Sequence, residues 1–90
     1  MAYTVSETNQ VIIEKAKKCA SKNGWELLWV RKFDNNPSNG YLSFVLCKRA
    51  ENDFCTHLFN HSGEGNGYFV YGHYDFKTFD EAFDDLLNRK

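Results

Sequence analysis

The chain has 90 residues, of which 42% are hydrophobic and 26% charged, and its formal net charge is −1. This composition is ordinary for one small globular domain over residues 1–90 and excludes an intrinsically disordered chain. No apolar run approaches the roughly 18 residues of a membrane-spanning helix, and residues 1–4 lack the basic start of a signal peptide. We therefore expect a soluble, cytoplasmic protein.

The first predicted element is a helix that begins at Thr4 and ends at Asn23-Gly24. Thr4 and Glu7 have the spacing of a capping box, and Gly24 tolerates the left-handed conformation that ends many helices. The residues expected on the apolar face of this helix recur at helical spacing. They are Val5, Ile12, Ala16, Cys19 and Ala20.

Four strands are predicted next, at residues 25–33, 41–48, 54–61 and 68–74, from their aromatic and β-branched content. In the first strand both alternating sets are apolar, which indicates a central strand or one with both faces covered. Residues 34–40 and 62–67 have the composition of loops. The glycine-rich segment 62–67 precedes a strand rather than a helix, which favours a hairpin loop over a phosphate site.

A second helix is predicted after Thr78, which forms another capping-box pair with Glu81. Its apolar stripe has the spacing i, i+3, i+4, i+7 and i+8, and comprises Phe79, Ala82, Phe83, Leu86 and Leu87. The predicted order is therefore α-β-β-β-β-α. Because the connections between strands are short, we expect an α+β fold with a four-stranded antiparallel meander and both helices packed on one face.

The residues able to bind a metal do not form a familiar motif. Cys55, His57 and His61 would share one face of the third strand, and His73 on the next strand would be near them. Strand geometry puts His61 too far along to share an ion with the other two, and no paired Cys-x2-Cys spacing is present. We expect structural or surface histidines, reduced structural cysteines, no metal, no cofactor and no catalytic residues.

Aromatic residues and charge asymmetry are the main functional signals. The chain holds eight Phe, five Tyr and two Trp, and a domain this small with both helices on one face would leave some of them on an open sheet face. Residues 1–49 hold eight basic and four acidic residues, a balance of +4, whereas residues 50–90 hold three and eight, a balance of −5. Such polarity would steer a charged partner.

The run Gly67 to Tyr74, followed by Thr78, Glu81, Ala82 and Arg89, resembles the tail of small proteins carried by bacteriophages and mobile elements. In size, acidity and α+β composition the chain also resembles anti-CRISPR proteins. That resemblance implies a protein that inhibits a host CRISPR-Cas complex by occluding one of its surfaces. It carries over no site residue.

We therefore expect a non-catalytic protein-binding module. The predicted partner-binding residues are the acids Asp80, Glu81, Asp84 and Asp85 and the tyrosines Tyr68, Tyr71 and Tyr74. One alternative is a homodimer that buries the aromatic sheet face against its own copy. Another is a nucleic-acid-binding domain that uses the lysines of the first helix, although the slightly negative net charge makes nucleic acid the less favoured partner.

Overall fold

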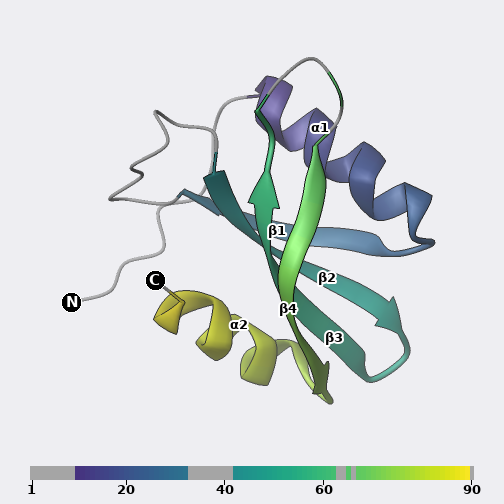
Figure 1. The fold of residues 1–90 in the computed structure, drawn as a ribbon. Helices are drawn as coiled ribbons and strands as arrows, with labels where there is room; N and C mark the ends of the chain where they lie inside the picture. Colours follow the sequence, from purple (N-terminus) through teal and green to yellow (C-terminus); the bar gives the residue numbers. More distant parts are fainter. Residues whose placement is uncertain (1–9, 33–41, 63–64, 66, 90) are drawn as a thin grey trace.

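The computed structural model of the protein describes residues 10–32, 42–62, 65 and 67–89. The predicted order of elements is confirmed: helix α1 (Gln10–Lys22), strands β1 (Glu26–Lys32), β2 (Leu42–Ala50), β3 (Asp53–Asn60) and β4 (Tyr68–Phe76), and helix α2 (Phe79–Asn88). The strands form one antiparallel sheet in the order β1-β2-β3-β4, which is the predicted meander (Figure 1). The Thr4 capping box and the loop over residues 34–40 lie outside the described residues.

The helix ends form through the local chemistry that the sequence predicts. Gly24 has φ +74°, and the N–H groups of Trp25 and Gly24 donate to the carbonyls of Ala20 and Ser21, each at 3.0 Å, which closes α1 in a Schellman motif. At α2 the capping box between Thr78 and Glu81 is complete. Within the described residues, neither helix is long and apolar enough to cross a membrane.

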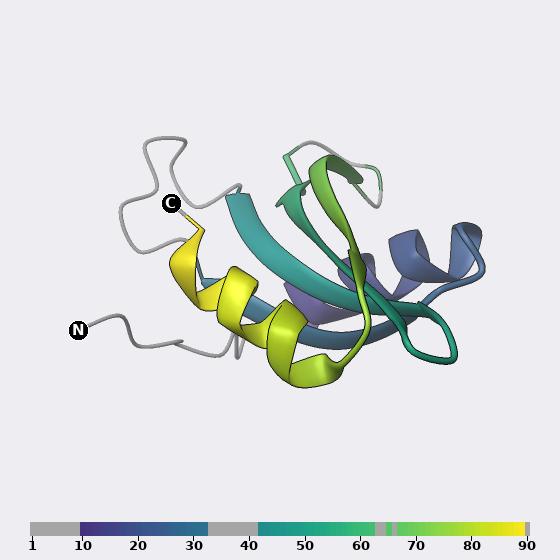
Figure 2. The ribbon, with the colours of Figure 1, turned by 90° about the horizontal axis from the view of Figure 1, so that it is seen from below.

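The two helices lie on opposite faces of the sheet, so the prediction that both pack on one face is wrong. α1 packs on the face that carries Val45 and Cys47 of β2 and Phe59 of β3. α2 packs on the other face, which carries the alternate β2 residues Phe44 and Leu46. In Figure 2, α2 lies in front of the strands and α1 lies behind them.

The reason for this arrangement lies in β2, where five consecutive residues, 43–47, are buried. Successive strand residues point to opposite faces, so an unbroken apolar run presents apolar side chains on both faces. With both helices on one face, the other set would face water at a cost of roughly 2 kcal/mol per large side chain. One helix on each face covers both sets.

β4 is an edge strand with two irregular positions. Tyr71 and Asp75 have positive φ values of 52° and 70°, and the register with β3 shifts on both sides of Thr56. These irregularities turn the Tyr71 side chain into solvent, where it is 76% exposed. An edge interrupted in this way is a poor template for pairing with another strand, so a partner would meet β4 through its side chains.

Candidate functional site

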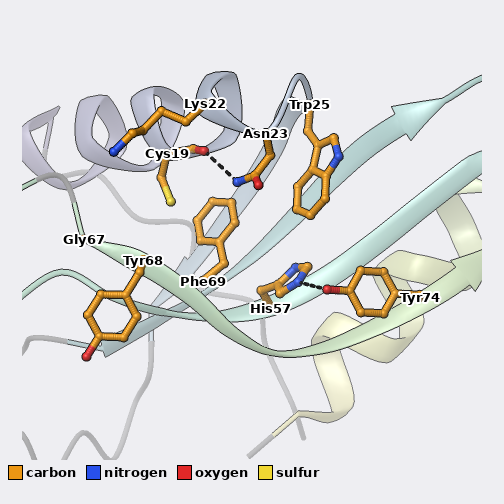
Figure 3. Close-up of a pocket in the computed structure, with 9 residues that line it drawn as sticks. All are labelled: Cys19, Lys22, Asn23, Trp25, His57, Gly67, Tyr68, Phe69 and Tyr74. Atoms are coloured by element: carbon orange, nitrogen blue, oxygen red, sulfur yellow. Dashed lines mark hydrogen bonds between the residues drawn. The ribbon is translucent and has the colours of Figure 1, made fainter.

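A groove of about 390 Å³ lies between the C-terminal end of α1, the middle of β3 and strand β4 (Figure 3). We call it the His57 groove. It combines residues from three elements that are far apart in the sequence. Its lining comprises Cys19, Lys22, Asn23, Trp25, His57, Gly67, Tyr68, Phe69 and Tyr74.

The walls of the groove are aromatic rings with similar orientations. The centroid of the His57 ring is 5.5 Å from that of Trp25, with planes 29° apart, and 5.5 Å from that of Phe69, with planes 28° apart. Trp25 and Phe69 are 6.5 Å apart and nearly parallel, at 13°. Tyr74 meets the His57 ring edge-on at 5.1 Å. Trp25 and Phe69 are half-buried, and half-buried rings with aligned faces are suited to stacking on a flat group.

His57 is neutral at physiological pH. The ring is 3% exposed, and burial, followed by the positive charges of Arg89 and Arg49, lowers the pKa of His57 to about 4. Its Nε2 atom is hydrogen-bonded to the Tyr74 hydroxyl at 2.8 Å. Its Nδ1 atom is buried and has no hydrogen-bond partner among the described residues.

The described residues that line the groove include one cationic side chain and no carboxylate. In the part of the chain that the structure describes, Lys22 in the last turn of α1 is the only charged residue that lines the groove. Beside it, the side-chain amide of Asn23 donates to the Cys19 carbonyl at 3.0 Å, which directs the amide carbonyl away from that contact (Figure 3). The groove is therefore shaped for a flat group with a negative substituent.

Gly72 allows the His57–Tyr74 pair to lie against β4. A Cβ atom at this position would be 2.4 Å from the His57 Nε2 atom and 2.6 Å from the Tyr74 ring. A glycine inside an aromatic strand is a sequence signal for such a close approach. It is the signal that would have pointed to this groove, because Trp25, Phe69, Lys22 and Asn23 were not predicted as site residues.

The predicted acidic residues of α2 divide into two groups. Glu81 accepts hydrogen bonds from the backbone N–H groups of Lys77 and Thr78, at 3.0 and 3.1 Å, so it holds the helix start. Asp85 accepts from the Thr56 hydroxyl at 2.5 Å and contacts Nδ1 of His73 at 3.0 Å.

The remaining two acids are available to a partner. Asp80 and Asp84 are exposed, and neither carboxylate has a hydrogen bond or ion pair among the described residues. They are four residues apart and therefore lie on one side of α2.

The predicted tyrosines do not form one set. Tyr74 belongs to the His57 groove through its hydroxyl, and the Arg49 guanidinium lies over its ring at 4.8 Å. Tyr68 lines the edge of the groove, yet its ring points away from α1 (Figure 3). Tyr68 and Tyr71 are 55% and 76% exposed.

The histidines and cysteines of β3 and β4 are divided between the two faces of the sheet. Cys55, His57 and His61 share the α1 face as predicted, with His61 hydrogen-bonded to the Ser43 hydroxyl at 3.1 Å. His73 lies on the other face, against Asp85. Among the described residues, no group of three or more possible ligands is placed to hold a metal ion. Burial raises the pKa of the Cys55 thiol to about 11, which makes it a poor nucleophile.

Comparison of the chain with protein-family models, with curated protein sequences and with solved structures found no match. The resemblance to anti-CRISPR proteins therefore stays a prediction. The geometry of this chain offers two candidate surfaces: the His57 groove, and the exposed residues of β4 and α2.

Proposed function

We propose that the protein is a non-catalytic protein-binding module that docks onto a basic surface of a partner protein. The docking surface comprises Tyr68, Tyr71, Asp80 and Asp84, and we call it the β4–α2 surface. The observation that carries the proposal is the exposure of Tyr71, the most exposed large hydrophobic residue among those described, at 76%.

Tyr71 is held firmly although its ring is exposed. The Arg89 guanidinium, which follows α2, donates to the Tyr71 carbonyl and to the Thr56 hydroxyl. This contact joins β4 at Tyr71 to the C-terminal end of α2, the helix that carries the acidic residues. A tyrosine on a fixed backbone gives up little conformational freedom on binding, which suits an anchor residue.

The charge of α2 supports a basic partner. The helix contains four carboxylates and no Lys or Arg. Two of these carboxylates, Asp80 and Asp84, are available at its exposed side. Carboxylates at the rim of an interface act mainly on the association rate and on partner choice. Following the resemblance to anti-CRISPR proteins, we propose a nucleic-acid-binding effector complex as the partner class and occlusion of its basic surface as the mode of action.

The test is affinity capture from a bacterial lysate, carried out with the tagged wild type and with three tagged variants of the chain. Asp80→Asn/Asp84→Asn and Tyr71→Ala remove the two parts of the surface. Glu14→Gln/Glu26→Gln removes the same number of charges from α1 and β1. We expect one stoichiometric partner to bind the wild type and the α1–β1 control, and to be lost or strongly reduced with the other two variants.

The affinity of the purified complex should also fall with rising salt, and this slope should be smaller for Asp80→Asn/Asp84→Asn. Equal capture by all the variants, or equal salt slopes, would contradict the proposed surface. A change in capture by the α1–β1 control alone would move the partner to the opposite side of the molecule.

A further inference from the structure

We propose that the His57 groove binds a nucleotide, with the base stacked on Trp25 and Phe69 and the phosphate at Lys22. This inference goes beyond the proposed function and does not rest on it. The groove lies on the α1 side of the sheet, whereas α2 packs on the opposite side. Tyr68 lines the edge of the groove and also belongs to the β4–α2 surface, but the variants that test the docking surface replace Tyr71, Asp80 and Asp84, none of which lines the groove. The two proposals can therefore fail independently.

The shape of the groove favours a flat ring. Its volume of about 390 Å³ lies in the usual range for small-molecule sites. Trp25 and Phe69 are both half-buried, so each keeps part of its ring surface available, and their planes are within 13° of each other. Aromatic side chains that leave one face open are the usual stacking partners of bases in proteins that bind single strands.

The charge of the groove decides between an anionic and a cationic ligand. A group of aromatic rings also suits quaternary ammonium ions, which bind over ring faces. Among the described lining residues only Lys22 is charged; it repels a cation, and no carboxylate among them attracts one. The low pKa of His57 keeps its ring neutral. The same Lys22 attracts a phosphate.

Asn23 supplies a polar group for the edge of a base. Its Nδ2 atom donates a hydrogen bond to the Cys19 carbonyl. Its Oδ1 atom remains available as an acceptor. Exocyclic amines of adenine and cytosine donate to acceptors of this kind. With stacking, an acceptor and a cation present together, the groove matches a nucleotide better than a neutral aromatic compound or a phosphate alone.

The nucleotide could be free or part of a single strand, and the two would contact different lengths of α1. Lys15, Lys18 and Lys22 are spaced i, i+3 and i+7 and so follow one side of the helix. Lys15 and Lys18, together with Glu14, line a second hollow of about 320 Å³ along α1. A free nucleotide would need Lys22 alone, whereas a single strand would carry further phosphates along the other two lysines.

The experiment uses Trp25 as a reporter in a Trp29→Phe variant. Trp29 lies on the α2 face against Phe83, so its replacement leaves the groove intact. Adenosine monophosphate, adenosine, inorganic phosphate and tetramethylammonium are titrated separately, and calorimetry on the wild type repeats each titration. We expect saturable quenching by adenosine monophosphate, weaker quenching by adenosine, and none by phosphate or tetramethylammonium.

Two lysine variants then test the position of the phosphate. Lys22→Ala should weaken binding of adenosine monophosphate about tenfold, as expected for the loss of one charge-assisted contact. Lys17→Ala is the matched control, because Lys17 is on the same helix, is paired with Glu14 and does not line the groove. Its affinity should change less than about twofold.

Three results would overturn the proposal: no binding of adenosine monophosphate, equal losses in Lys22→Ala and Lys17→Ala, or preferential binding of tetramethylammonium. A short single-stranded oligoadenylate separates the two sources. If it binds more tightly than adenosine monophosphate and is weakened by Lys18→Ala, the ligand is a strand. If it binds with the same affinity as adenosine monophosphate and Lys18→Ala does not change that affinity, the ligand is a free nucleotide.

Discussion

His57 lies on the α1 face of the sheet and is buried among aromatic rings. Trp25 and Phe69 both stack against the ring, each with its centroid 5.5 Å away, and Tyr74 meets its edge. The hydroxyl of Tyr74 satisfies one ring nitrogen, while Nδ1 has no partner among the described residues. A buried imidazole in such surroundings is stable only as the neutral ring. Stability should therefore depend on pH through this residue.

The pH dependence follows from the pKa of His57, which is lowered from 6.5 to about 4. As pH falls below 6.5, the unfolded chain takes up the proton first, so stability is lost between pH 6.5 and about 4. At pH 5 this single group should lower the free energy of unfolding by about 2 kcal/mol relative to pH 7.

Two measurements check this prediction. Urea denaturation of the wild type should show the loss between pH 7 and pH 5, and His57→Gln should show less of it. An NMR titration of the wild type should give the His57 ring a midpoint near 4. A midpoint near the ordinary value of 6.5 would mean that the ring is accessible to water.

Gly72 offers a second test at the scale of single residues. An added Cβ would meet the His57 Nε2 atom at 2.4 Å and the Tyr74 ring at 2.6 Å. We expect Gly72→Ala to lower the free energy of unfolding by roughly 1–3 kcal/mol, the usual cost of overpacking, and to change the fluorescence of Trp25. Gly65→Ala is the control, since its nearest atom would be 4.0 Å away. Equal effects of the two substitutions would show that the His57–Tyr74 pair is not held in this position.

At the scale of elements, the C-terminal end of α2 depends on a residue from β1. The last turn of α2 contains no basic residue. Instead Arg31, which is 8% exposed, donates to the carbonyls of Leu86 and Arg89 at 2.8 and 2.7 Å. Its guanidinium also lies over the Phe44 ring at 5.1 Å. A cation at this end of a helix satisfies the last carbonyls and complements the helix dipole.

Replacement of Arg31 should therefore loosen α2. Arg31→Met keeps much of the hydrocarbon but leaves two carbonyls without their donor, which should cost roughly 1.5–3 kcal/mol of stability. Arg31→Lys should recover part of this loss. Urea denaturation followed by circular dichroism measures both effects. Lys17→Met, on the exposed side of α1, is the control and should be nearly neutral; an equal loss there would remove the argument for Arg31.

At the scale of the whole molecule, one helix on each face of the sheet has two consequences. The open aromatic sheet face that a homodimer was expected to bury is not formed as predicted, because α1 and α2 cover different faces. The charges are also separated in space, since α1 carries four lysines and one glutamate and α2 carries four carboxylates. The molecule thus presents a basic and an acidic side.

This arrangement predicts a monomer. Light scattering on the purified chain at micromolar concentration should give a mass near 10.5 kDa, because the exposed aromatics of β4 lie on an interrupted edge strand rather than on a wide apolar face. A mass of twice this value would contradict the prediction. The exposed tyrosines of β4 would then be the first residues to replace.

The sequence by itself determined the features that depend on neighbours along the chain. The capping box at Thr78 and the turn at Gly24 follow from local hydrogen bonding, and the four strands follow from their residue types and short connections. Even the face of α1 was predicted for Ile12, Ala16, Cys19 and Ala20, because helical periodicity is a local property.

The tertiary structure alone decided the placement of the helices and the composition of the site. Which sheet face each helix covers depends on strand register, since a shift of one residue exchanges the two faces. The His57 groove needs α1, β3 and β4 in their final positions before Lys22, His57 and Phe69 meet. The fold also decided which acids of α2 remain available: Glu81 and Asp85 accept hydrogen bonds within the molecule, whereas Asp80 and Asp84 accept none among the described residues. No local pattern contains these distances.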